Sequence, residues 1–121
     1  MNDPAEWQLY VSPSGRSPVM HEILKAKLTN PETQSLDELQ RRYARGEALP
    51  KDARVLKPLG LEELRLFGNH RSFRILFVRR GSGLILLALT FAEKKSSSLP
   101  ESVIARAAAR RDDWDRRHRP H

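Results

Sequence analysis

Three short apolar segments follow one another within residues 57–100, and glycine-containing turn signals separate them. The signals are Gly-Asn at residues 68–69 and Gly-Ser-Gly at residues 81–83. Apolar runs joined by such short turns are typical of an antiparallel meander, because each turn returns the chain alongside the preceding run. This stretch therefore predicts three consecutive strands that pair in sequence order.

The alternation of side chains within these strands predicts which face each residue occupies. In the first strand, Leu64 and Leu66 point to one face and Arg65 to the other. The second strand alternates in the same way around Arg74. The third, residues 84–92, is apolar on both faces, which is typical of a central strand covered on both sides.

The chain before the meander is expected to form a strand and a helical hairpin. Residues 7–11, WQLYV, are rich in aromatic and β-branched side chains and precede a turn, as strands do. A helix is expected from a Ser17 cap to Thr29, and a second from an Asn30 cap to Gly46. Both carry apolar residues at helical spacing, so they would pack over the sheet.

The remaining segments complete the expected order of elements. Residues 47–60 hold two prolines and no sustained period, which predicts a connector. Ser98 and Glu101 have the spacing of a capping box, which predicts a last helix followed by a flexible tail from about residue 115 to 121. The expectation is a single α+β domain, residues 1–121, with the order β-α-α-β-β-β-α and a small antiparallel β-sheet.

The charge of the chain is unevenly distributed. The formal net charge is +7, with nine Lys and Arg against eight Asp and Glu in residues 1–60, and thirteen against seven in residues 61–121. A basic half favours a polyanion such as nucleic acid, or an acidic protein, as partner. Charge that only keeps the surface soluble is the alternative.

Several classes of protein are not indicated by the sequence. No apolar run approaches the roughly 20 residues of a membrane span, and the first residues do not have the pattern of a signal peptide. A soluble, cytoplasmic protein without membrane partners is therefore expected. The chain has no cysteine and only four scattered histidines, so no metal site is expected. Serine or cysteine hydrolase motifs and glycine-rich phosphate loops are not found either.

Four cations would converge if the three strands pair in sequence order, namely Arg65, Arg74, Lys94 and Lys95. Cleavage of RNA without a metal can proceed by attack of the ribose 2′-hydroxyl on phosphorus, and cations must then meet the charge on the phosphoryl oxygens. Arg65, Arg74 and Lys95 are each expected to face the substrate and to occupy no core volume. The alternatives are cross-strand ion pairs for Arg65, which is near Glu63, and for Arg74 beside a strand turn, and a solubilising role for the lysines.

The sequence motifs also resemble a known family. They are GRSPV at residues 15–19, KPLG followed by LEELR, FRILFVRRG, and LLALTF leading into EKK and Pro100. In this order and spacing they resemble the HigB-like, phage-associated branch of the RelE/ParE toxins of type II toxin-antitoxin systems. The resemblance covers nearly the whole chain and implies a RelE-like fold, with a small antiparallel sheet, two N-terminal helices and a C-terminal helix.

The resemblance implies a ribosome-dependent mRNA endonuclease that acts on codons in the A site of the 30S subunit. A cognate helix-turn-helix antitoxin would neutralise it, and it would need no cofactor. Residue by residue, the implied catalytic cations are Arg65, Arg74, Lys94 and Lys95, with Lys94 or Lys57 transferring a proton, and the implied RNA-binding residues are Lys57, Arg71, His70 and Arg54.

The chain departs from this family at the general base. Relatives have a tyrosine or histidine near the end of the sheet or in the last helix, whereas this chain has no tyrosine after Tyr43. Glu93 or His70 could substitute, or the cations could act through orientation and electrostatics alone, although His70 also fits a solvent-facing turn residue. Two other functions stay open, a ParE-like inhibitor of DNA gyrase and a nucleic-acid-binding domain without activity.

Overall fold

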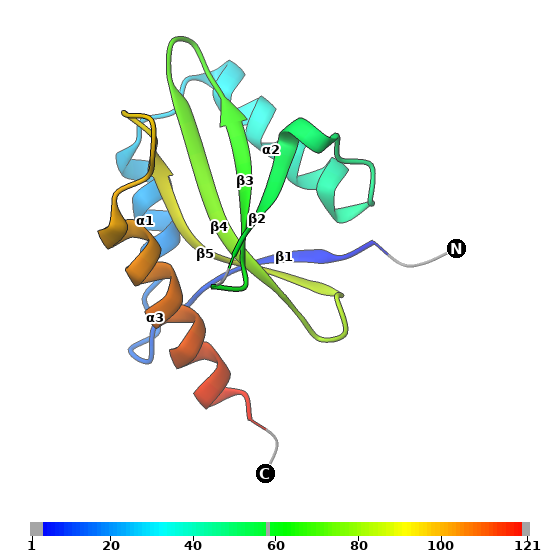
Figure 1. Ribbon diagram of the computed structural model, residues 1–121, viewed down its shortest axis with the longest axis vertical. Coiled ribbons are helices and arrows are strands. Elements are labelled where there is room, and N and C mark those ends of the chain that lie inside the picture. The colour runs from blue at the N-terminus through cyan, green and yellow to red at the C-terminus, as the bar shows by residue number, and fades with distance from the viewer. Residues whose placement is uncertain (1–3, 58, 120–121) are drawn as a thin grey trace.

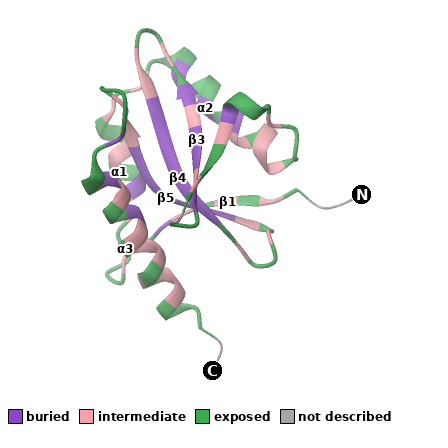
Figure 2. Ribbon diagram, viewed as in Figure 1, coloured by how far each residue is buried: buried purple, intermediate pink, exposed green. Residues whose placement is uncertain are grey.

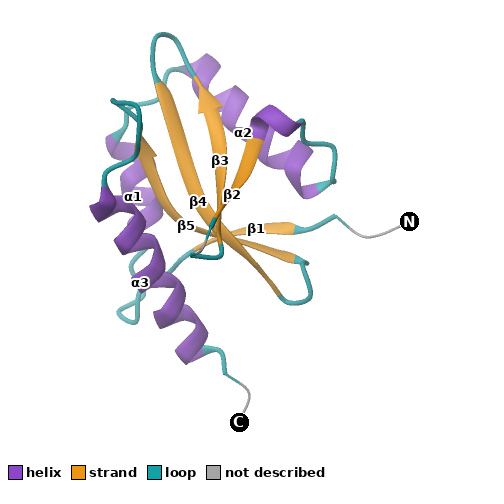
Figure 3. Ribbon diagram, viewed as in Figure 1, coloured by secondary structure: helices purple, strands orange, loops and turns teal. Residues whose placement is uncertain are grey.

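The structure is a computed structural model that describes residues 4–57 and 59–119 (Figure 1). Five strands and three α-helices form an α+β fold with an open, mixed sheet (Figure 3). The elements are β1 (Glu6–Leu9), α1 (Pro18–Lys25), α2 (Asn30–Ala44), a short 3-10 helix η1 (Pro50–Asp52), β2 (Ala53–Leu56), β3 (Leu61–Phe67), β4 (Ser72–Arg80), β5 (Ile85–Glu93) and α3 (Glu101–Arg117). No helix in the described ranges is both long and apolar enough to cross a membrane.

The sheet has the strand order β1-β5-β4-β3-β2. Strands β3, β4 and β5 pair antiparallel in sequence order, so the predicted meander is confirmed. Strand β1 lies parallel to β5, and the expectation of a wholly antiparallel sheet is therefore wrong. The direction of β1 depends on the path of the chain through both N-terminal helices, which local sequence patterns do not contain.

Strand β2 corrects the predicted order of elements. Residues 47–60 were expected to form a connector, but Ala53 to Leu56 pair antiparallel with Leu64 to Leu61 of β3. The four-residue strand lies at the edge of the sheet, and its two central side chains, Arg54 and Val55, are exposed. Without a buried face it has no apolar alternation, so periodicity does not detect it.

The N-terminal helices begin and end near the predicted residues, with different caps. Ser17 precedes α1 but makes no side-chain capping bond, and α1 ends at Lys25 rather than at Thr29. Thr29 caps α2 in place of Asn30, because its hydroxyl accepts a bond from the Glu32 N–H at 3.2 Å while the Glu32 carboxylate accepts one from the Thr29 N–H at 2.9 Å. This reciprocal pair is a capping box.

The C-terminal helix differs from its prediction at both ends. Pro100 is the N-cap and no side chain caps the helix, so the predicted Ser98–Glu101 capping box is wrong. Instead, the Pro100 carbonyl accepts a bond from the Val103 N–H at 3.0 Å. The helix continues to Arg117, well into the expected tail. Residues 120–121 of that tail lie outside the described residues.

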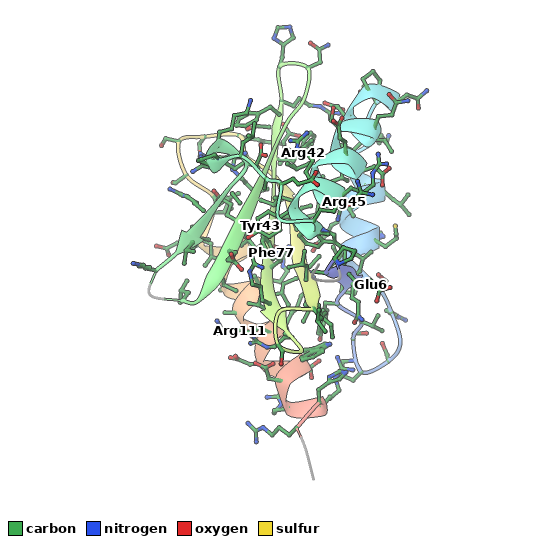
Figure 4. All side chains as sticks on the ribbon, turned by 90° about the vertical axis from the view of Figure 1, so that its right-hand side faces the viewer. Glu6, Arg42, Tyr43, Arg45, Phe77 and Arg111 are labelled. Carbon is green, nitrogen blue, oxygen red and sulfur yellow. The ribbon has the colours of Figure 1, made fainter. Side chains whose placement is uncertain are left out.

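Helices α2 and α3 cover opposite faces of the sheet. Neighbouring residues of a strand point to opposite faces, and the Arg79 guanidinium bonds to Tyr43 of α2 while the Arg80 guanidinium bonds to Asp115 of α3. The α2 face buries the ring of Phe77, which meets the rings of Tyr43 and Trp7 edge-on at centroid distances of 5.1 and 5.0 Å. Figure 4 shows Tyr43 and Phe77 side by side in this core.

The α3 face of the sheet is covered only in part. Helix α3 packs against β5 and β4 and runs along the β5 side of the sheet (Figure 1). Purple ribbon follows β4 and β5 in Figure 2, whereas β2 is mostly green. The end of the sheet formed by β2, β3 and the beginning of β4 therefore carries polar and charged side chains on this face.

Candidate nucleic-acid interface

Three arginines and one glutamate from three adjacent strands meet on the α3 face of the sheet. Arg54 of β2 pairs with Glu63 of β3 in the strand register, and Arg65 of β3 pairs with Arg74 of β4. Cross-strand partners share a face, and Glu63 and Arg65 are two residues apart, so all four side chains project to the same side. We refer to these four residues as the arginine cluster.

A single carboxylate oxygen holds the arginine cluster together. Glu63 Oε1 lies 3.0 Å from Arg54 Nε, 3.4 Å from Arg65 Nε and 3.5 Å from Arg74 Nε. The Glu63 side chain is only 4% exposed. Three positive charges against one negative charge leave the cluster with a formal excess of +2. The carboxylate orders the arginines without neutralising them, which favours binding of a further anion.

Arg74 is the buried member of the arginine cluster, with 6% of its side chain exposed. Burial lowers its pKa, Glu63 opposes this effect, and the charges of Arg65 and Arg54 add to it. Its Nη1 donates to the Phe73 carbonyl at 2.9 Å, while its Nε makes no hydrogen bond. The expectation that Arg74 occupies no core volume is therefore wrong. A buried guanidinium stays charged, and the Glu63 carboxylate 3.5 Å from Arg74 Nε is its compensating charge.

A shallow hollow of about 460 Å³ lies beside the arginine cluster, at the end of the β3–β4 hairpin. We refer to it as the hairpin hollow. Its lining residues are Phe67, Gly68, His70, Arg71, Ser72, Glu93, Lys94 and Lys95. Four of the residues predicted from sequence therefore gather at this one place, two from the turn between β3 and β4 and two from the segment after β5.

The strand register places the hairpin hollow next to the arginine cluster. The Lys94 N–H donates to the Ser72 carbonyl at 2.8 Å, and Ala92 pairs with Arg74. Lys94 and Arg74 are therefore diagonal neighbours on adjacent strands, with Cα atoms roughly 7–8 Å apart. The four predicted catalytic cations thus lie at the same end of the sheet.

Arg71 is engaged within the protein. Its guanidinium forms an ion pair with Glu32 at the start of α2 and donates to the carbonyls of Ala26 and Lys27 at 3.2 and 3.4 Å. The Arg71 ion pair, followed by the bond from the Thr29 backbone, lowers the pKa of Glu32 to about 2. Arg71 therefore fixes the β3–β4 turn against the N-terminal helices, a role that the sequence did not indicate.

Lys57 lies apart from the other predicted residues. It follows β2 in the turn that leads to Leu61, whereas the hairpin hollow begins at Phe67. Strand β3, which runs from Leu61 to Phe67, spans about 20 Å at 3.4 Å per residue. The structure therefore does not bring Lys57 to the hairpin hollow, although the family resemblance implied a common site.

The two candidate proton acceptors both line the hairpin hollow. His70 is exposed in the turn with φ of 59°, and Glu93 is half-buried at the end of β5. The tyrosine hydroxyls are elsewhere. Tyr43 donates to Glu62 at 2.9 Å on the α2 face, and Tyr10 donates to Asp113 of α3 at 2.6 Å. No group of three His, Asp or Glu side chains among the described residues is arranged to hold a metal ion.

Sequence reasoning missed two contributors to this surface. Glu63 was considered only as an ion-pair partner that would argue against a functional Arg65, whereas it contacts all three arginines. Phe67 was not considered, although it follows Arg65 at a spacing of two and therefore shares its face. The pattern Glu-x-Arg-x-Phe at residues 63–67 contained this signal.

Comparison with known proteins adds no family assignment. No protein-family model matches the chain, and no curated protein matches it. The resemblance to the RelE/ParE toxins therefore depends on the sequence motifs alone, and the chemistry of the surface must be argued from the arginine cluster and the hairpin hollow.

Proposed function

We propose that this protein is a ribosome-dependent mRNA endonuclease of the HigB-like branch of the RelE/ParE toxins. The observation that supports it most is the arginine cluster, in which three guanidinium groups share one carboxylate oxygen. An excess of fixed positive charge at the end of a sheet suits the phosphodiester of a single RNA strand. The basic half of the sequence agrees with such a substrate.

In the proposed reaction, the ribose 2′-oxygen forms a bond to the adjacent phosphorus and the bond from phosphorus to the 5′-oxygen breaks. The 2′-hydroxyl loses its proton to a base, and the departing 5′-oxygen receives one from an acid. Arg65, Arg74 and Lys95 would hold the phosphoryl oxygens, where negative charge increases in the transition state. Lys94 would donate to the departing oxygen, because it lines the hairpin hollow beside the cations that hold the phosphate.

The proposed base is Glu93 or His70, since both line the hairpin hollow beside Lys94. Fixed cations lower the barrier even where the base is weak, because they stabilise the negative charge that develops on the phosphoryl oxygens. The proposed partners are the A site of the 30S subunit with its mRNA, and a helix-turn-helix antitoxin. A cytoplasmic location and the absence of a cofactor belong to the same proposal.

Cleavage on the ribosome tests this function. Purified protein is mixed with ribosomes that carry a defined mRNA, and primer extension locates the cut. We expect cleavage within the A-site codon, and a roughly 100-fold slower reaction for Arg65→Ala, because one phosphate contact is lost. Arg41→Ala is the matched control, since Arg41 is 62% exposed and pairs with Asp37 on α2.

Three results would contradict the proposal. Intact mRNA together with arrested DNA supercoiling would identify a gyrase inhibitor. Intact mRNA together with salt-sensitive RNA binding would identify a binding domain without activity. Equal cleavage rates for the wild type and Arg65→Ala would show that the arginine cluster is not the reactive surface.

A further inference from the structure

Phe67, the last residue of β3, is an exposed aromatic side chain beside the arginine cluster. It is 61% exposed, and the other large apolar residues that the described ranges expose are aliphatic. A single exposed apolar residue requires no explanation by itself. Phe67, however, has cations of the arginine cluster and of the hairpin hollow as neighbours.

Phe67 lines three hollows. One is the hairpin hollow, to which Lys94 and Lys95 contribute. The other two lie beside α2, and one of them is lined by both cations and carboxylates, namely Arg42, Lys51, Arg65, Glu38 and Asp52. The Arg74 guanidinium lies 5.6 Å from the ring centroid. The exposed ring therefore lies beside the arginine cluster and at the border of the hairpin hollow.

The backbone around Phe67 is held firmly. Next to it, Gly68 packs so closely on α2 that an added β-carbon would overlap the Glu32 carboxylate. Glu32 is itself bound by Arg71 of the same turn. Opposite Phe67 in the register is Ser72, whose small side chain leaves room above the sheet. A rigid backbone with an open ring face is a pre-organised platform.

We propose that Phe67 is a stacking platform for one base of a single-stranded RNA, with the adjacent phosphates on the arginine cluster and on Lys94 and Lys95. Every base has a π-face, and proteins that bind single strands combine such rings with a cationic track. Packing of the ring against Arg74 alone would explain the cation–π contact but leaves most of the ring in solvent. This inference depends on the proposed RNA substrate and names how that substrate is held.

Binding of an uncleavable oligonucleotide tests the platform without the reaction. The probe is a short single strand with 2′-deoxy sugars that carries one 2-aminopurine, whose fluorescence falls when it stacks. We expect the wild-type chain to quench it, Phe67→Leu to bind about tenfold more weakly without quenching, and Phe67→Tyr to restore both signals. Leu84→Ala is the matched control, since Leu84 is 54% exposed beside the β4–β5 turn.

An abasic site in place of 2-aminopurine separates stacking from phosphate contacts. The wild type and Phe67→Leu should bind the abasic strand with equal affinity, and the salt dependence of binding should be the same for both chains. Equal affinity and equal quenching of the 2-aminopurine strand by wild type and Phe67→Leu would overturn the inference. Failure of the wild type to bind or quench that strand would overturn it as well.

The two proposals fail in different ways. If the protein quenches 2-aminopurine through Phe67 but does not cleave mRNA on ribosomes, the proposed endonuclease activity is contradicted and the proposed stacking role of Phe67 stands. If the wild type and Phe67→Leu cleave mRNA at the same rate and with the same KM, the proposed stacking role of Phe67 is contradicted and the proposed endonuclease activity stands.

Discussion

Strand β4 carries arginines at both of its ends, and their charge is compensated differently at the two. At its beginning, Arg74 shares one carboxylate oxygen with Arg54 and Arg65. At its end, Arg79 has Glu62 at 3.1 Å, and Arg80 has both oxygens of Asp115 at 2.8 and 2.9 Å. We refer to Arg79, Arg80, Glu62 and Asp115 as the paired end.

Paired arginines are also found along α3, which holds much of the positive charge of residues 61–121. Arg117 pairs with Asp113 at 2.7 Å, and Arg110 pairs with Glu22 at 3.0 Å while it donates to the Leu89 carbonyl. Arg110 connects α3 to α1 and β5, whereas the Arg117–Asp113 pair lies within α3. The number of arginines in a region therefore does not identify a binding surface, and the ratio of cations to nearby carboxylates is the better guide.

The largest expected difference between the two ends of β4 is in catalysis. Arg74→Ala should slow cleavage on the ribosome by roughly 10²- to 10³-fold, because a fixed donor to the phosphate is lost. Arg80→Ala should cleave at the wild-type rate. Arg74→Lys should be nearly as slow as Arg74→Ala, since an ammonium group cannot replace the planar fork. Single-turnover rates at saturating enzyme measure the effect.

Because Arg74 is buried, its variants need a test of folding. Thermal unfolding of Arg74→Lys should remain cooperative, so that lost activity reflects lost chemistry. Wild-type cleavage by a folded Arg74→Lys chain would remove the distinction between the two ends of the strand.

The second expected difference is in stability. Glu63→Gln leaves three neighbouring guanidinium groups without their buried anion, and we expect the free energy of unfolding to fall by about 2 kcal/mol. Asp115→Asn at the paired end should cost less than about 1 kcal/mol, because the Asp115 and Arg80 side chains are 38% and 31% exposed. Urea denaturation compares the two variants, and equal losses would show that Glu63 is an ordinary surface partner.

The sequence predicted the part of this surface that depends on strand alternation. Turn signals fixed the pairing of β3 with β4, and that pairing brings Arg65 opposite Arg74. The edge strand β2 was not predicted, because Arg54 and Val55 face solvent and give no apolar period. The third arginine of the cluster could therefore not be placed next to Glu63 from sequence alone.

Contacts between distant segments were also beyond the sequence. Arg71 was predicted to bind RNA from the family resemblance, yet its partner Glu32 is 39 residues away on α2. Phe67 had the right spacing from Arg65, but only the folded chain shows that Phe67 is exposed at the border of the hairpin hollow. Periodicity assigns a face to a residue, whereas its neighbours on that face depend on the tertiary fold.

The smallest expected difference is in the response to acid. The bond from Arg80 is the main cause that lowers the pKa of Asp115 below its usual value of 3.8. A carboxylate whose pKa is lowered by folding adds stability at pH values above its unfolded pKa, and this stability is lost as the pH falls through the folded pKa. Wild-type stability should therefore decrease below about pH 4, and Arg80→Ala should decrease less steeply because its Asp115 has lost that partner. Thermal melts between pH 6 and 2 measure the slope, with Arg41→Ala as a control that keeps the wild-type profile.

A slope that Arg80→Ala leaves unchanged would mean that the ion pair at the paired end contributes nothing to stability in solution. The charge of both ends of β4 would then be equally available to an anion, and the contrast between them would have to rest on catalysis alone.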